Sequence, residues 1–77
     1  RQVTQQSLAY QQSKVSALVD LKAQWQRLDT EASQYSDDRV VENIRAQQRA
    51  VIGQMRLEAA YIEGSVPSDI VLFLSSR

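Results

Sequence analysis

Three carboxylates lie close together near the middle of the chain, at Asp37, Asp38 and Glu42. Converging acidic side chains are what acid–base catalysis or a divalent cation would require, and no other segment of the sequence gathers them. Aspartate is also favoured at the start of a helix, where its charge complements the helix dipole. Because that structural role accounts for the whole cluster, we expect a capped, solvent-exposed helix start, with weak cation binding as the alternative.

Few other residues of the chain are of a type that could take part in catalysis. The chain contains neither histidine nor cysteine, which excludes Ser–His and Cys–His nucleophile pairs and the usual zinc ligands. Gly53 and Gly64 stand alone, without the spacing of a glycine-rich phosphate loop. A helical enzyme that works with arginine and glutamate side chains alone has no positive support. We therefore predict no enzyme activity, no catalytic or metal-binding residues and no cofactor.

Arginines form a further candidate site. Arg45, Arg49 and Arg56 fall on one side of a predicted helix, and Arg39 lies near its start. However, nine basic residues are balanced by nine acidic ones, so the net charge is zero. Nucleic-acid binders gain most of their non-specific affinity from neutralising phosphates. We expect a solvated basic face, and a nucleic-acid-binding helical hairpin is the less well supported alternative.

Two periodic segments must position these side chains. In both segments the seam residues recur at spacings of three and four, which is typical of a helix that packs lengthwise on another helix. The first seam consists of Leu18, Leu21, Trp25, Leu28, Ala32 and Tyr35, and the second of Val41, Ile44, Gln48, Val51, Met55, Glu58 and Ile62. We predict helices over residues 5–35 and 37–63, and the short link between them forces an antiparallel arrangement.

The antiparallel arrangement also pairs the polar residues of the two seams. Trp25 falls opposite Gln48, and we expect the Gln48 amide oxygen to accept the indole N–H of Trp25. Lys14 falls opposite Glu58, which predicts an ion pair. Trp25 is the only tryptophan, and we interpret it as a core anchor, with an interface position as the alternative.

The segment from Ser65 to Arg77 is compatible with two structures. Gly64 and Pro67 end the second helix. Ser68 and Asp69 could then cap a short third helix, whereas the run Ile70–Leu74 is also β-branched and aromatic enough for a buried strand. In either case this apolar run must dock on the hairpin or on another chain.

A second packing face runs along the second predicted helix, roughly opposite its seam. We call it the small-residue face, and it consists of Ala46, Ala50, Gly53, Leu57 and Ala60. Glycine costs about 1 kcal/mol in a helix interior relative to alanine, so its presence there suggests a close contact or a kink. The residues that we predict to contact another protein are Ala46, Ala50, Gly53, Leu57, Ile70, Leu72 and Phe73.

The size of the chain points to association. A core in 77 residues rarely supplies more than about 3–5 kcal/mol without a disulfide, a metal or a partner. We predict one all-α module over residues 1–77, an antiparallel two-helix hairpin with a short third element, which completes a four-helix or similar bundle with a second copy or with other helices of an assembly. No apolar run is long enough to span a membrane. The chain begins at Arg1, not Met, so we expect a processed form or a fragment.

The order of the elements supports an alternative function. A glutamine-rich start, a helical hairpin and a Val66–Pro67 step before a possible strand resemble, in outline, the membrane-proximal coiled coil of bacterial pilus and type II secretion platform proteins. The resemblance covers most of the chain and rests on element order, without a specific motif. It implies a regulatory or sensory helical domain of a membrane-anchored protein, of the platform or receptor type, in which residues 69–75 form a strand that begins a further domain.

Overall fold

The computed structural model describes residues 5–62 and 64–77 and contains three helices. They are α1 (Gln5–Ala32), α2 (Asp38–Tyr61) and α3 (Ser68–Ser75). No strand occurs in these two ranges, so the predicted all-α class is confirmed. Glu63, the expected last residue of the second helix, lies outside the described residues.

The first helix is shorter than predicted, because α1 ends at Ala32 and not at Tyr35. Beyond Ala32 the backbone tightens: the Gln34 N–H donates to the Glu31 carbonyl at 3.0 Å, and the Tyr35 N–H donates to the Ala32 carbonyl at 3.3 Å. Bonds of this i to i−3 type use up the last free carbonyls of a helix. Tyr35 is 48% exposed and Ala32 is buried, so the packed seam of α1 ends at Ala32.

The start of α2 confirms the structural interpretation of the acidic cluster. Asp37 is the N-cap, and its Oδ1 accepts a hydrogen bond from the Arg39 N–H at 2.9 Å. Asp38 follows in the first helical turn, where a negative charge complements the helix dipole. Glu42 instead pairs with Arg49, at 2.9 Å between Oε1 and Nη2.

The apolar segment near the C-terminus is a helix, so the strand that the secretion-platform resemblance implied for residues 69–75 is wrong. Pro67 precedes α3, and its carbonyl accepts hydrogen bonds from the N–H groups of Ile70 and Val71. Ile70 and Phe73 are both buried, whereas Leu72 is exposed. Burial at a spacing of three belongs to one face of a helix, because a strand would bury alternate residues.

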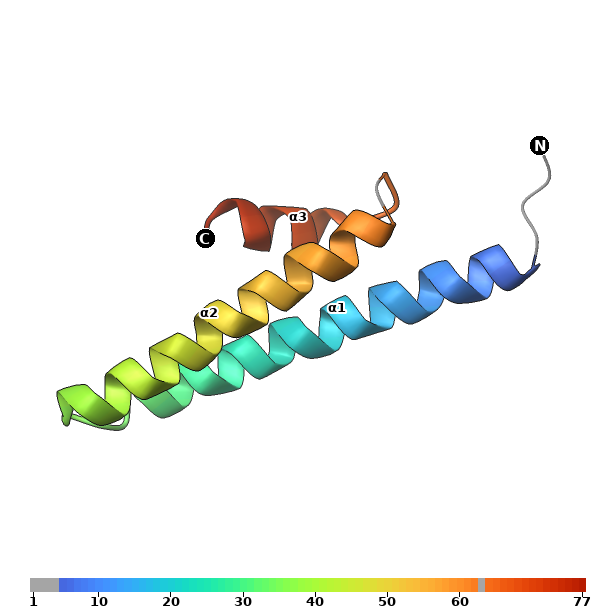
Figure 1. Cartoon of the computed structure of the whole chain (residues 1–77). Helices are drawn as coiled ribbons and strands as arrows, with labels where there is room; N and C mark the ends of the chain where they lie inside the picture. Colours follow the sequence, from blue (N-terminus) through green and yellow to red (C-terminus); the bar gives the residue numbers. More distant parts are fainter. Residues whose placement is uncertain (1–4, 63) are drawn as a thin grey trace.

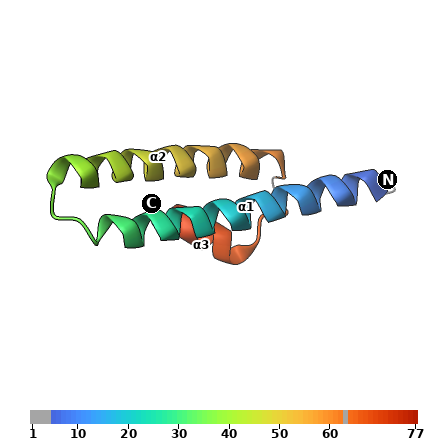
Figure 2. The same cartoon turned by 90° about the horizontal axis from the view of Figure 1, so that it is seen from below.

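The two long helices lie side by side and run in opposite directions, and α3 folds back against them (Figure 1; Figure 2). Gly64 permits the reversal after α2, since its φ of +87° lies in the left-handed region that favours glycine. The three fully buried large side chains, Leu18, Met55 and Ile70, come one from each helix. The core is therefore centred where all three helices meet.

The predicted register of the two long helices is supported by an ion pair. The Lys14 Nζ lies 2.8 Å from the Glu58 Oε2, as expected. Because Glu58 is close to the end of α2, the first turns of α1 extend past that end (Figure 2). Leu8 and Tyr10 on this extension are about half-exposed, at 49% and 47%.

Candidate interaction surface and arginine groove

The small-residue face lies on the outside of α2. Ala46, Ala50, Gly53 and Ala60 are exposed, and Leu57 is 52% exposed. A Cβ added to Gly53 would have no atom within 4 Å among the neighbours considered, so this part of the face is open. Four of the seven predicted contact residues, at positions 46, 50, 53 and 57, are thus available to another molecule.

The three predicted contact residues of the C-terminal segment are divided between the inside and the outside of the protein. Ile70 is fully buried and Phe73 is 8% exposed, and both belong to the core shared with α1 and α2. Leu72 points away and is 70% exposed. While α3 is docked, only Leu72 of these three is accessible to a partner.

The arginines of α2 line an open groove together with the C-terminal arginine. The groove has a volume of about 480 Å³, and we call it the arginine groove. Its walls include four arginines, one indole and one glycine, namely Arg45, Arg49, Arg56, Arg77, Trp25 and Gly53. No carboxylate lines the groove itself within the described part of the chain. The groove lies on the side of α2 where Trp25 of α1 and the end of α3 come near, so all three helices position it.

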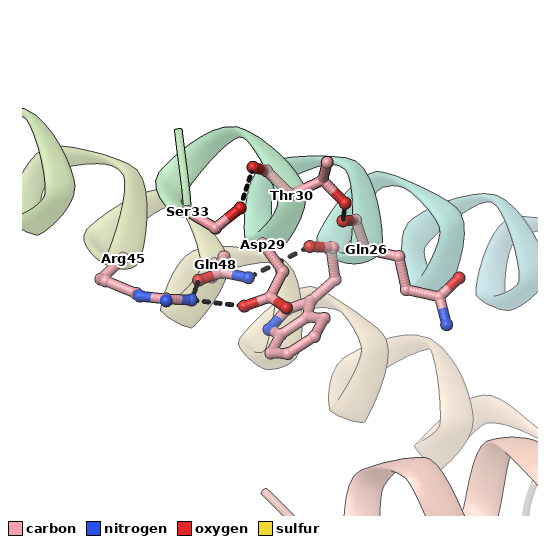
Figure 3. Close-up of polar contacts among 7 residues, drawn as sticks. Gln26, Asp29, Thr30, Ser33, Arg45 and Gln48 are labelled. Atoms are coloured by element: carbon pink, nitrogen blue, oxygen red, sulfur yellow. Dashed lines mark hydrogen bonds and ion pairs between the residues drawn. The ribbon is translucent and has the colours of Figure 1, made fainter. Parts of the chain in front are cut away.

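A buried amide joins α1 to α2 beside this groove. Gln48 is 3% exposed. Its Nε2 donates to the backbone carbonyl of Trp25 at 3.1 Å, and its Oε1 accepts from Arg45 Nη1 at 2.7 Å (Figure 3). The predicted bond from the indole N–H to Gln48 is therefore wrong, although the two residues do face each other. The Gln48 oxygen is taken by the arginine, a charged donor and thus a stronger one than an indole N–H.

Asp29 completes this polar network from α1. Its Oδ1 accepts a hydrogen bond from Arg45 Nη1 at 2.6 Å (Figure 3). The bond from Arg45 holds the pKa of the Asp29 carboxyl below its ordinary value, since it stabilises the charged form. Asp29 thus stays ionised under conditions in which a free aspartate begins to bind a proton.

Trp25, the aromatic side chain that lines the groove, packs against the core. Trp25 and Phe73 pack edge to face, with ring centroids 5.3 Å apart and planes at 86°. The Arg77 guanidinium lies 4.4 Å from the centroid of each ring. Guanidinium groups stack favourably on aromatic rings, so this contact positions Arg77 at the groove.

The Lys14–Glu58 pair lies outside the groove. The hydrogen bond from Lys14 lowers the pKa of Glu58, and the same bond raises the pKa of Lys14. The Lys14 ammonium is also 4.6 Å from the Tyr61 ring centroid and 5.4 Å from that of Tyr10. This pair helps to align α1 with α2, and neither of its residues lines the groove.

Comparisons with protein families, with curated proteins and with solved structures found no match for this chain.

Two properties of the helices bear on possible sites and partners. Across residues 5–62 and 64–77, no three acidic side chains are grouped in a way that would hold a metal ion. In the same part of the chain, no helix combines the length and the apolar character that crossing a membrane requires.

Sequence reasoning placed Arg45, Arg49 and Arg56 on one side of a helix but missed Asp29 and Arg77 as their neighbours. The spacing of Asp29 from Trp25, one helical turn apart, was the available signal for Asp29. For Arg77 the chain offered no such signal, because its position depends on how α3 packs against Trp25.

Proposed function

We propose that this chain is a non-enzymatic interaction module that acts by helix–helix association, within a homo-oligomer or a larger assembly. The antiparallel hairpin of α1 and α2 forms the rigid body of the module, and the small-residue face of α2 receives another helix. The observation that supports this function best is the open outer surface of α2 at Gly53, next to the half-exposed Leu57. Glycine weakens a helix, yet Gly53 meets no crowding inside this chain that would require its small size.

Association would supply the apolar burial that so small a core lacks. Each square ångström of apolar surface removed from water contributes about 25 cal/mol, so covering exposed side chains such as Leu57, Val71 and Leu72 stabilises the assembled form. Small side chains at 46, 50 and 53 let the second helix approach closely, which increases the number of van der Waals contacts.

Light scattering over a concentration series, with helicity followed in parallel, tests this function. We expect the mass to rise with concentration and to rise less in Ala50→Gln, which places a long side chain on the small-residue face. Ala9→Gln is the matched control, since Ala9 is an exposed alanine near the start of α1. A folded monomer at every concentration would contradict self-association, and equal behaviour of the two variants would show that association uses another surface.

A further inference from the structure

The arginine groove concentrates positive charge in a protein whose net charge is zero. Four guanidinium groups line it, and the carboxylates of Asp29 and Glu42 bind Arg45 and Arg49 from outside its lining. In these contacts Arg45 uses only Nη1 and Arg49 only Nη2. A guanidinium carries five N–H donors in a planar fork, so both arginines retain donors for a further acceptor.

The positions of the arginines favour an extended ligand over a compact one. Arg45, Arg49 and Arg56 are spread over three turns of α2, about 16 Å at 1.5 Å per residue. A single inorganic anion could reach only one or two of them. Arg77 also lines the groove, where it stacks on Trp25 and Phe73. Its Nη1 donates to the Ser76 hydroxyl at 2.9 Å, and the other N–H groups of the five-donor guanidinium can bind a further acceptor.

Carboxylates are the anions that these arginines already bind. Asp29 and Glu42 show two of the four arginines in charge-assisted contact with carboxylate oxygens, at 2.6 Å and 2.9 Å. A nucleic-acid backbone would instead need a larger excess of positive charge, because its affinity comes largely from counterion release. Trp25 is also the only tryptophan of the chain, so the groove offers a single base-stacking indole.

We propose that the arginine groove is a binding site for an acidic peptide segment of a partner protein, whose glutamate or aspartate side chains contact Arg49, Arg56 and Arg77. The site is separate from the small-residue face, although Gly53 borders both. It requires α3 to be docked, because Arg77 follows α3 and reaches the groove where Phe73 of α3 packs on Trp25 of α1. Binding therefore stabilises the three-helix arrangement by mass action.

Trp25 fluorescence of the full chain provides the test, since the only indole lies in the groove. The probe is a nine-residue peptide of alternating glutamate and alanine, and its matched partner has glutamine in place of every glutamate. We expect the acidic peptide to change the fluorescence saturably and the glutamine peptide to leave it unchanged. Affinity should fall as salt rises, because exposed charge pairs are screened.

Arginine variants locate the site. Arg49→Gln and Arg56→Gln should each weaken binding of the acidic peptide by about 2- to 5-fold, the usual range for one exposed charge pair. Arg27→Gln removes the same charge from the exposed outer side of α1 and should leave the affinity unchanged. Circular dichroism of each variant checks that the helices are retained.

Three results would overturn the proposal. The first is equal binding of the acidic and glutamine peptides, and the second is an equal loss of affinity in Arg27→Gln and Arg56→Gln. The third is a result in which the acidic peptide does not bind but a nine-nucleotide single-stranded RNA does, and in which Arg56→Gln weakens the binding of the RNA. That result would assign the groove to nucleic acid. None of these outcomes depends on whether the small-residue face associates, so the two proposals fail separately.

Discussion

Gln48 is a polar residue at a buried position of the contact between α1 and α2. Both ends of its amide have partners, the Trp25 carbonyl on one helix and Arg45 on its own. Buried polar groups that are fully satisfied help to specify one arrangement of the surrounding elements. At this position the pairing fixes which residues of α1 face which residues of α2, because an amide displaced by one turn would lose the Trp25 carbonyl.

Replacing this amide with a side chain of similar length tests its contribution. Gln48→Met removes both hydrogen bonds and should lower the free energy of unfolding by about 1 kcal/mol. Gln47→Met, on the neighbouring exposed residue, should change it by less than about 0.5 kcal/mol. Urea unfolding followed by circular dichroism measures both. Equal stabilities of the two variants would contradict a role for Gln48 in joining the helices.

The ion pairs predict how stability depends on pH. Asp29 and Glu58 have pKa values below their ordinary values in the folded protein, so their contribution is fully present at neutral pH and is lost as pH falls through those lowered values. Lys14 has a raised pKa, so its contribution is present below the ordinary lysine value and is lost as pH rises through the raised one. The urea midpoint should be level near neutrality and should fall at both extremes.

Variants that remove one carboxylate show which ion pair causes the loss of stability at low pH. Glu58→Gln should reduce the loss of stability below about pH 4, where free carboxyl groups become protonated. The control is Glu31→Gln on the exposed side of α1, which removes the same charge away from this ion pair. An acid limb that is identical in the two variants would rule out the Lys14–Glu58 pair as a source of the pH dependence.

At the scale of the elements, the two glycines have opposite roles. Gly64 has a φ of +87° at the reversal between α2 and α3, whereas Gly53 has helical neighbours and open space around it. The same change therefore acts in opposite directions at the two positions. Whether replacing a glycine raises or lowers the stability therefore depends on the backbone conformation at that position.

Alanine substitution at each glycine tests this directly. Gly64→Ala should lower the free energy of unfolding by about 1–2 kcal/mol, because a side chain in the left-handed region clashes with the following carbonyl. Gly53→Ala should raise it by up to about 1 kcal/mol, since alanine favours the helix and its Cβ meets no neighbour. Urea midpoints of the two variants that shift in the same direction would contradict the assigned backbone conformations.

Local sequence signals accounted for most features of the elements. The Asp37 cap and the stop at Gly64 followed from residue types within one or two helical turns, and the Lys14–Glu58 pair followed from aligning the two seams in antiparallel directions. The end of α1 at Ala32 did not, because Tyr35 continues the apolar spacing and only the packing shows that it lies outside the seam.

At the scale of the whole molecule, α3 completes a core that the two long helices leave open. Trp25, half-buried on α1, gains its edge-to-face partner Phe73 from α3. Ile70 is fully buried against Leu18 and Met55 in the same core cluster. The stability of the chain and the shape of the arginine groove therefore depend on the same contact.

Two neighbouring residues of α3 should respond very differently to truncation. Phe73→Ala removes a buried ring and should cost about 3–5 kcal/mol, enough to unfold much of a small domain. Leu72→Ala removes a side chain that is 70% exposed and should cost less than about 0.5 kcal/mol in the monomer. Thermal unfolding followed by Trp25 fluorescence measures the loss of stability in each of the two variants. A mild effect of Phe73→Ala would mean that α3 is not docked in solution.

The sequence by itself determined the all-α class and the approximate extent of the two long helices, because periodicity and capping act over a few residues. The alignment of these helices also followed from the sequence, because the short link makes them antiparallel and this sets Lys14 opposite Glu58. The sequence also supplied the residues of the small-residue face and three of the four groove arginines. Tertiary structure decided that Ile70–Leu74 is helical, that Ile70 and Phe73 face inward and that Arg77 reaches the groove. Five apolar residues fit a helix or a strand equally well, and the choice depends on contacts with Leu18, Trp25 and Met55, far away in the chain.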